Sequence, residues 1–446
     1  MVRSRRGPHF PGPPAIPERL ELTQPQPFGA DEPDVPAAAS RPAAMRFIMI
    51  TVLIDMMAIG VIVPVLPLLV GSFTSDPVQA ALWYGAVAFA FSLANFFGAP
   101  ILGALSDRYG RRPVLLLGFC GLALNFFATA LATQLWMLIA VRLVGGAMQA
   151  NAAVANAYVA DITAPQDRAK RFGMLGAMFG LGFIIGPVMG GLLGGIDLHL
   201  PFFAAGVLAL LNLVYGLFVL PESLPLARRS KVTWGAANPI ASLKQLGATR
   251  GIGSLVLVIA LSNLAQFVMY TNWVLYTGYR FGWGATQNGW SLFAVGIAAA
   301  VVQGFLLSRL LKRFSPQRLV IVGLVSSSLG YLLWGLSTEG WMMYVVIACN
   351  LLGFTVTASL QSIVSNAADS SSQGQTMGAV AALTSLMAVL GPVIGSPLMA
   401  AVSHLPPADW RVGAPFFFCS AMQLLSMLVA ARHFSRQRRL CATVAA

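Results

Sequence analysis

The feature of this sequence that most constrains its fold is a nearly unbroken succession of long apolar stretches from Arg46 onward. Each is long enough to cross a hydrocarbon core of roughly 30 Å, which takes about 20 helical residues. Inside a bilayer every backbone N–H and C=O must be paired within the chain, so these stretches predict membrane-spanning helices. The twelve expected spans are 46–70, 80–103, 113–133, 135–160, 171–195, 201–220, 251–276, 286–308, 318–338, 340–364, 376–402 and 412–432.

Composition and charge agree with a protein embedded in a lipid bilayer. The chain is 57% hydrophobic and only 10% charged, whereas soluble domains carry roughly 25% charged residues. A net charge of +13 would suggest nucleic acid as the partner of a soluble protein. Here the basic residues lie between the apolar stretches, where membrane orientation explains them, so no nucleic-acid partner is expected.

The distribution of Lys and Arg predicts the orientation. Most of the 28 basic residues lie in loops on one side of the expected spans, and the other side holds only Arg280 and Arg411. By the positive-inside rule, both termini are expected in the cytoplasm. We expect a multi-pass protein of a bacterial inner membrane.

Polar stretches divide the chain into five parts. These are a disordered Pro-rich N-terminal tail (1–44), an N-terminal six-helix half (45–220), a cytoplasmic central loop (221–250), a C-terminal six-helix half (251–432) and a cytoplasmic tail (433–446). The first is too polar to fold by itself, and an alternative is that Met45 is the physiological start.

The two halves resemble each other at one constant offset. Trp136-Met137 recurs as Trp341-Met342, and GPVMGG at 186–191 recurs as GPVIGS at 391–396. Several matches in one register indicate duplication. Two parallel repeats are typical of transporters whose substrate site lies between the halves, near the middle of the membrane.

Enzyme chemistry has no visible basis in the sequence. The four cysteines and four histidines are isolated, and no H-E-x-x-H metal site or G-x-x-x-x-G-K-[ST] phosphate loop occurs. We therefore expect no metal, no cofactor and no use of ATP. An intramembrane enzyme or receptor is the rival from another class, but no nucleophile-base cluster supports it.

The loop GALSDRYGRRP at 103–113 has a mechanical interpretation. Gly103 permits close helix approach, Gly110 permits a tight turn, and Asp107 can accept hydrogen bonds at a neighbouring helix N-terminus, where the dipole favours an anion. Its basic members are Arg108, Arg111 and Arg112, which the positive-inside rule alone would also explain.

These residues resemble the loop motif G-x-x-x-D-[RK]-x-G-[RK]-[RK] of the major facilitator superfamily, with every fixed position filled. The resemblance implies an all-helical fold of twelve transmembrane helices in two six-helix halves. It also implies that the Asp107 contact latches the cytoplasmic side shut. The equivalent loop of the second half has Lys312 in place of the acid, so the latch is expected on one side only.

Glycines recur along the expected helix at 171–195. Their spacing matches the antiporter motif G-x8-G-x3-G-P-x2-G-G of exporters in this superfamily, at Gly173, Gly182, Gly186, Pro187, Gly190 and Gly191. Glycine at these positions lets another helix pack backbone to backbone, and Pro187 permits a bend. Ordinary Gly-rich packing is the alternative, but the complete spacing favours an exporter.

One acid and one arginine lie well inside the expected spans. Asp55 is in the first and Arg142 is in the fourth, about 8 Å apart along the membrane normal. Ionisable residues in a membrane are functional candidates by default. Burial favours the neutral acid and a nearby guanidinium favours the carboxylate, which suits a group that exchanges protons. The alternative is an Asp that only caps a kink or bonds a neighbouring backbone.

Further stretches resemble the tetracycline/proton antiporters of this superfamily, from Met45 to about Arg432. They are TVLIDMMAIGVIVPVLP at 51–67, GRRPVLLLG at 110–118, LWMLIAVRLVGG at 135–146 and NWVLYTGYRFGWG at 272–284. That family usually has further acids in helices 3 and 9, where this chain has Asn125 and Ser327. The departure favours an uncharged or weakly charged amphiphile over a cationic metal chelate.

Polar and aromatic residues in the expected helices 4, 7 and 10 are candidates for contacts with the substrate. They are Gln149, Asn151, Asn156, Asn263, Gln266, Tyr270 and Gln361. Each could equally form an interhelical hydrogen bond. We expect a proton-driven exporter of a small lipophilic compound that needs no protein partner. A proton-coupled importer or metabolite exporter of the same superfamily is the alternative.

Overall fold

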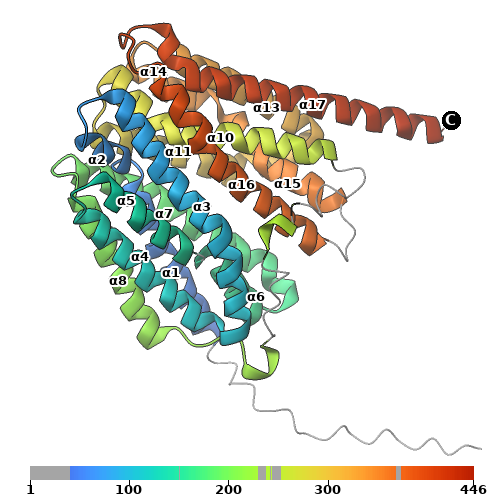
Figure 1. Ribbon diagram of the computed structural model, residues 1–446. Helices are drawn as coiled ribbons and strands as arrows, with labels where there is room; N and C mark the ends of the chain where they lie inside the picture. The colour runs from blue at the N-terminus through green and yellow to red at the C-terminus, as the bar shows by residue number, and fades with distance from the viewer. Residues whose placement is uncertain are drawn as a thin grey trace, which may run out of the picture. The chain divides into compact units, whose positions relative to one another are not determined.

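The computed structural model describes residues 41–149, 151–229, 238–241, 243, 253–367 and 373–445, which contain helices and connecting turns but no strand (Figure 1). The predicted tail up to Ser40 and most of the predicted central loop lie outside these ranges. In the first half the helices are α1 (Arg41–Ile62), α2 (Leu66–Ser72), α3 (Pro77–Tyr109), α4 (Arg111–Ala130), α5 (Leu135–Met148), α6 (Asn151–Ile162), α7 (Arg168–Gly194) and α8 (Leu200–Val219). In the second half they are α10 (Gly253–Phe281), α11 (Ala285–Val301), α12 (Leu307–Arg313), α13 (Pro316–Leu336), α14 (Gly340–Cys349), α15 (Val356–Ala367), α16 (Gln373–Ala400) and α17 (Ala414–Ala445).

The predicted all-helical membrane fold is confirmed. Eleven helices among the described residues are long and apolar enough to cross a membrane, and the count is twelve if one bent pair forms a single span. Some boundaries are set by local chemistry. Asp76, for example, accepts a hydrogen bond from the Val78 N–H at 3.0 Å and caps α3, whose first residue is Pro77.

Two of the expected spans are broken near their middle. The span at 135–160 consists of α5 and α6, and the span at 340–364 consists of α14 and α15, which meet at 52°. In the first break, the Asn95 side-chain amide donates to the Gln149 carbonyl at 2.6 Å, so a carbonyl freed at the break is paired. Broken helices are typical of the substrate level in transporters.

The two halves contact each other mainly through two helix pairs, α3 with α16 and α7 with α11, and α10 also touches α2 and α3. Figure 1 shows α3 lying beside α16. Counted as membrane spans, α3 and α16 are the second and the eleventh, and α7 and α11 are the fifth and the eighth. Each span of the first half corresponds to the span six places later in the second half, so exchanging the two halves converts one pair into the other. This equivalence fits the internal repeat in the sequence.

Glycines of α7 form a close seam with α1 and α11. A Cβ on Gly186 would lie 2.7 Å from the Gly60 Cα in α1, and one on Gly191 would lie 2.9 Å from the Gly289 Cα in α11. The Thr286 hydroxyl of α11 also donates to the Gly191 carbonyl at 3.1 Å. The halves are therefore sealed at this end of α7.

The other end of α7 is different. No atom of a neighbouring helix lies within 4 Å of where a Cβ would stand on Gly173, Gly176 or Gly180. This end belongs to what we call the basic end of the bundle, where the loops at 104–112, 161–171 and 309–318 lie. The glycines of α7 are thus closely packed at the end far from the basic end, whereas those near the basic end contact no neighbouring helix among the described residues.

This contrast predicts different tolerance of two glycines on one helix. Gly186→Ala should lower the apparent melting temperature, because overpacking at the Gly60 contact costs about 1–3 kcal/mol. Gly176→Ala is the matched control and should melt like the unaltered protein, since its new methyl group meets no atom. Equal melting of the two variants in detergent would contradict the seam.

Candidate functional site

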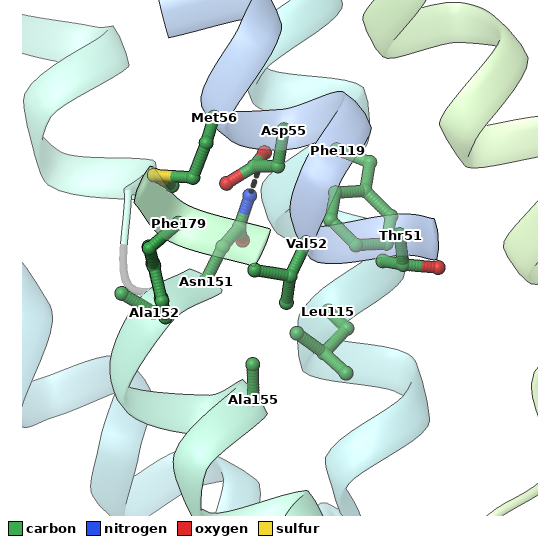
Figure 2. Close-up of a pocket in the computed structure, with 10 residues that line it drawn as sticks. All are labelled: Thr51, Val52, Asp55, Met56, Leu115, Phe119, Asn151, Ala152, Ala155 and Phe179. Atoms are coloured by element: carbon green, nitrogen blue, oxygen red, sulfur yellow. Dashed lines mark hydrogen bonds between the residues drawn. The ribbon is translucent and has the colours of Figure 1, made fainter. Parts of the chain in front are cut away.

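Asp55 of α1 is the one buried acidic side chain in the described part of the chain, with 2% of its surface exposed. The Asn151 amide, at the start of α6, donates a hydrogen bond to its Oδ1 at 2.9 Å (Figure 2). The two residues face each other where the broken fourth span resumes. A polar contact thus links a membrane-buried carboxyl group to a helix break.

A small cavity adjoins this pair. Its volume is about 10 Å³, the size needed for roughly one water molecule. The cavity is lined by Thr51, Val52, Asp55, Met56, Leu115, Phe119, Asn151, Ala152, Ala155 and Phe179. Because most of these side chains are apolar, Asp55 is shielded from bulk water while a single water-sized space lies beside it.

Arg142 occupies a different position from Asp55. Its side chain is buried, and no ion pair joins it to Asp55 in the described residues. Asn151, the partner of Asp55, follows Arg142 by nine residues and lies on α6, beyond the end of α5 that carries Arg142. The direct Asp55–Arg142 contact left open by the sequence is therefore not formed in this conformation.

The loop motif forms a charged cluster inside the N-terminal half. Arg111 pairs with Asp107 at 2.6 Å and, through its Nε, with Asp161 of α6 at 3.0 Å. Arg111 also donates to the Ser106 hydroxyl at 2.6 Å, while Arg108 lies over the Tyr109 ring. Arg111 thereby ties α3, α4 and α6 together at the basic end.

A carboxylate does occupy a helix N-terminus in this cluster, but it belongs to Glu222. Its two oxygens accept the backbone N–H groups of Arg111 and Arg112 at 2.8 and 3.2 Å, which caps α4. Gly110 has φ of +106°, a conformation that favours glycine, and a Cβ there would collide with Glu222. Asp107 is exposed enough to find other partners, and the latch stays a prediction.

The predicted substrate-contact residues fall into two groups. Asn151 and Asn263 bond other helices, the latter donating to the Thr384 hydroxyl at 2.9 Å. The side chains of Asn156, Tyr270 and Gln361 are exposed, and those of Gln149 and Gln266 are half-buried. Gln266 donates to the Tyr270 hydroxyl at 2.8 Å on one face of α10.

A larger cavity lies between the halves at the end opposite to the basic end. Its volume is about 330 Å³, in the lower range of small-molecule sites. It is lined by Pro67, Leu68, Gly71, Pro77, Ala80, Ala81, Val274, Leu275, Gly278, Tyr279, Met399 and Ser403. The lining is mainly apolar, and α2, α3, α10 and α16 all contribute to it.

Sequence reasoning missed three polar residues that complete these sites. Asp161 and Glu222 hold the basic-end cluster, and Asn95 pairs the carbonyl at the break of the fourth span. Acids directly after apolar stretches were the available signal for the first two. Nothing local in the sequence indicates the partner of Asn95.

The fold and these buried ionisable groups define a multi-pass membrane transporter rather than an enzyme. In the described residues no group of three or more His, Cys, Asp or Glu side chains could hold a metal ion. The family model of the Major Facilitator Superfamily matches residues 48–392 and 255–440. The chain belongs to that superfamily.

Curated relatives and solved structures agree with this assignment. The chain is 40% identical over 376 residues to the class C tetracycline resistance protein of Escherichia coli, covering 84% of this chain and 94% of the relative. It is 32% identical over 379 residues to the class B protein of the same organism, covering 84% and 93%.

Among solved structures, human organic anion transporter MFSD10 (TETRAN) matches with a TM-score of 0.65 and 24% identity, covering 87% of this chain and 99% of that one. The nucleoside transporter NupG matches with a TM-score of 0.72 and 14% identity, covering 88% and 99%. At these identities, the likeness concerns the fold alone.

The Glu222 contacts predict a local effect on α4. Glu222→Ala should destabilise its first turn by about 1 kcal/mol, because two backbone N–H groups lose their acceptor. Hydrogen exchange in a peptide spanning residues 110–118 should then be faster. Glu339→Ala is the control, since Glu339 precedes α14 without a side-chain capping bond. Unchanged exchange in the Glu222 variant would contradict the cap.

Proposed function

We propose that this chain exports a lipophilic, tetracycline-like amphiphile in exchange for protons, with Asp55 as the residue that carries the proton. The main observation in support is the burial of Asp55 beside Asn151 and a water-sized cavity. Protonation changes the charge of this group inside the membrane, so its two forms favour different surroundings. A group of this kind can couple a proton gradient to a change of conformation.

Asn151 suits this role because an amide can bond both forms of the acid. Its N–H donates to the carboxylate, and the same bond can be kept by the carbonyl oxygen of the protonated acid. The proton can then leave or arrive at the other oxygen through the adjoining cavity. Arg142 is the second charged residue of this proposal, a buried cation in the same half that forms no ion pair with Asp55 in this conformation.

We place the basic end in the cytoplasm, following the positive-inside rule. The conformation is then sealed toward the outside by the seam of α1, α7 and α11, while the glycines near the basic end are free. This corresponds to a state in which cargo enters from the cytoplasm. Closure of that side would bring the free stripe of Gly173, Gly176 and Gly180 against a neighbouring helix, and an Asp107 contact between the halves would latch it.

The cargo class follows from the polar residues of α6, α10 and α15. Asn156, Tyr270 and Gln361 are exposed and Gln266 is half-buried, and together they offer amides and a hydroxyl rather than charges. Such groups fit an amphiphile with several oxygen atoms. The names of the curated relatives, tetracycline resistance proteins, support a cargo of that kind. The apolar cavity at the outer end would receive it before release.

Everted vesicles test the proposal directly. With an imposed proton gradient, the unaltered protein should accumulate tetracycline. Asp55→Asn should abolish accumulation to the level of empty vesicles, because the amide has the same shape but cannot titrate. Downhill exchange should remain. Asp197→Asn is the matched control, since Asp197 is an exposed acid of an outer loop.

Each outcome separates two explanations. Uphill accumulation by the Asp55→Asn protein at the rate of the control would make Asp55 structural and remove the coupling mechanism. If the unaltered protein accumulates no tetracycline but drives proton-coupled uptake of a sugar or organic acid in whole cells, the alternative function, a proton-coupled importer, would be favoured.

A further inference from the structure

Three polar residues lie at one depth inside the N-terminal half. Tyr84 is seven residues after the start of α3, Arg142 is seven residues after the start of α5, and Asn125 is five residues before the end of α4. At 1.5 Å per residue, all three lie about 8–11 Å from the end of the bundle opposite to the basic end. The three helices contact one another.

The side chains converge between these helices. A Cβ on Gly145, one turn after Arg142 on α5, would collide with the Asn125 amide nitrogen. The Asn125 amide is thus directed at the stripe of α5 that carries Arg142. Tyr84, on α3, lies near enough to Arg142 for the charges of their ionised forms to affect each other. We call these three residues the outer polar cluster.

Three hydrogen-bond donors of this cluster have no acceptor among the described residues. Arg142 Nε, Arg142 Nη2 and Asn125 Nδ2 are buried, and none finds a partner in the described part of the chain. The Asn125 oxygen instead faces Thr129, whose hydroxyl lies 3.4 Å away. Only 3% of Arg142 and 4% of Asn125 is exposed, so water covers neither.

Such an arrangement is costly for the protein alone. An unpaired buried donor costs about 1–3 kcal/mol, and an uncompensated cation inside a membrane costs more. No carboxylate of the described residues pairs with Arg142, and Asp55 is engaged by Asn151 farther along the bundle. Three orphaned donors on two neighbouring helices, two of them on a cation, are complementary to a bound anion.

We infer that the outer polar cluster binds a small inorganic anion of the size and charge of chloride. A monoatomic anion can accept several N–H groups at once and neutralises the guanidinium. The cluster is enclosed by α3, α4 and α5 of one half, so its ligand is a resident ion rather than cargo carried between the halves.

Chloride should therefore stabilise the protein through this cluster. Purified protein in detergent should melt several degrees higher in sodium chloride than in sodium gluconate of equal ionic strength. Arg142→Gln should remove this difference. Asn125→Asp should remove it as well and raise melting in gluconate, because its carboxylate replaces the ion beside Arg142. Arg309→Gln changes an exposed arginine and should keep the chloride response.

Several results would overturn the inference. One is equal melting of the unaltered protein in the two salts. Another is an undiminished chloride response in Asn125→Asp, and this variant keeps the test informative if Arg142→Gln does not fold. A third is tetracycline in gluconate reproducing the chloride effect in the unaltered protein but not in Asn125→Asp, because the site would then take cargo. In crystals grown with bromide, anomalous signal should appear between α3, α4 and α5. Since melting needs no gradient, these outcomes do not depend on proton transport.

Discussion

Backbone-to-backbone packing of glycines along α7 is the contact on which the rest of this structure depends. Gly186 meets Gly60 of α1, and Gly191 meets Gly289 of α11, at distances that leave no room for a Cβ. The seam therefore joins α1, which carries Asp55, to α7 within the first half. It also joins α7 to α11 of the second half. In a membrane, where apolar surface gains nothing by leaving lipid, such close packing supplies much of the association energy.

The buried charges divide the first half into three levels. The Arg111 cluster ties α3, α4 and α6 at the basic end, Asp55 and Asn151 lie where the fourth span is broken, and Arg142 lies nearer the opposite end. Only the first is a paired ionic cluster within the described residues. Each of the other two has a single buried ionisable group without an ion-pair partner in the part of the chain that the structure describes, and inside a membrane a proton or an anion strongly changes the energy of such a group.

Hydropathy predicts the all-helical membrane fold correctly, for a physical reason. Long apolar stretches must form spans, and the confirmed all-helical fold follows from that requirement. Gly110 has a positive φ, which is a local property of the chain. Of the antiporter glycines, Gly186 and Gly191 pack closely against other helices, whereas Gly173 does not.

Contacts between distant residues could not be obtained in this way. The breaks near Gln149 and Asn350 contain no proline, and they depend on side chains such as Asn95 that pair the freed backbone groups. Glu222 replaces Asp107 as the cap of a helix because the chain after α8 returns to the start of α4. Asn125 is visible in the sequence as an amide, but its lack of a partner appears only in three dimensions.

The most direct test of proton exchange at Asp55 is proton release from purified protein in weakly buffered detergent. A pH dye reports protons as tetracycline is added, and tryptophan fluorescence reports binding in the same sample. The account predicts proton release by the unaltered protein, and binding without release by Asp55→Asn. Equal proton release by both proteins at equal binding would contradict it.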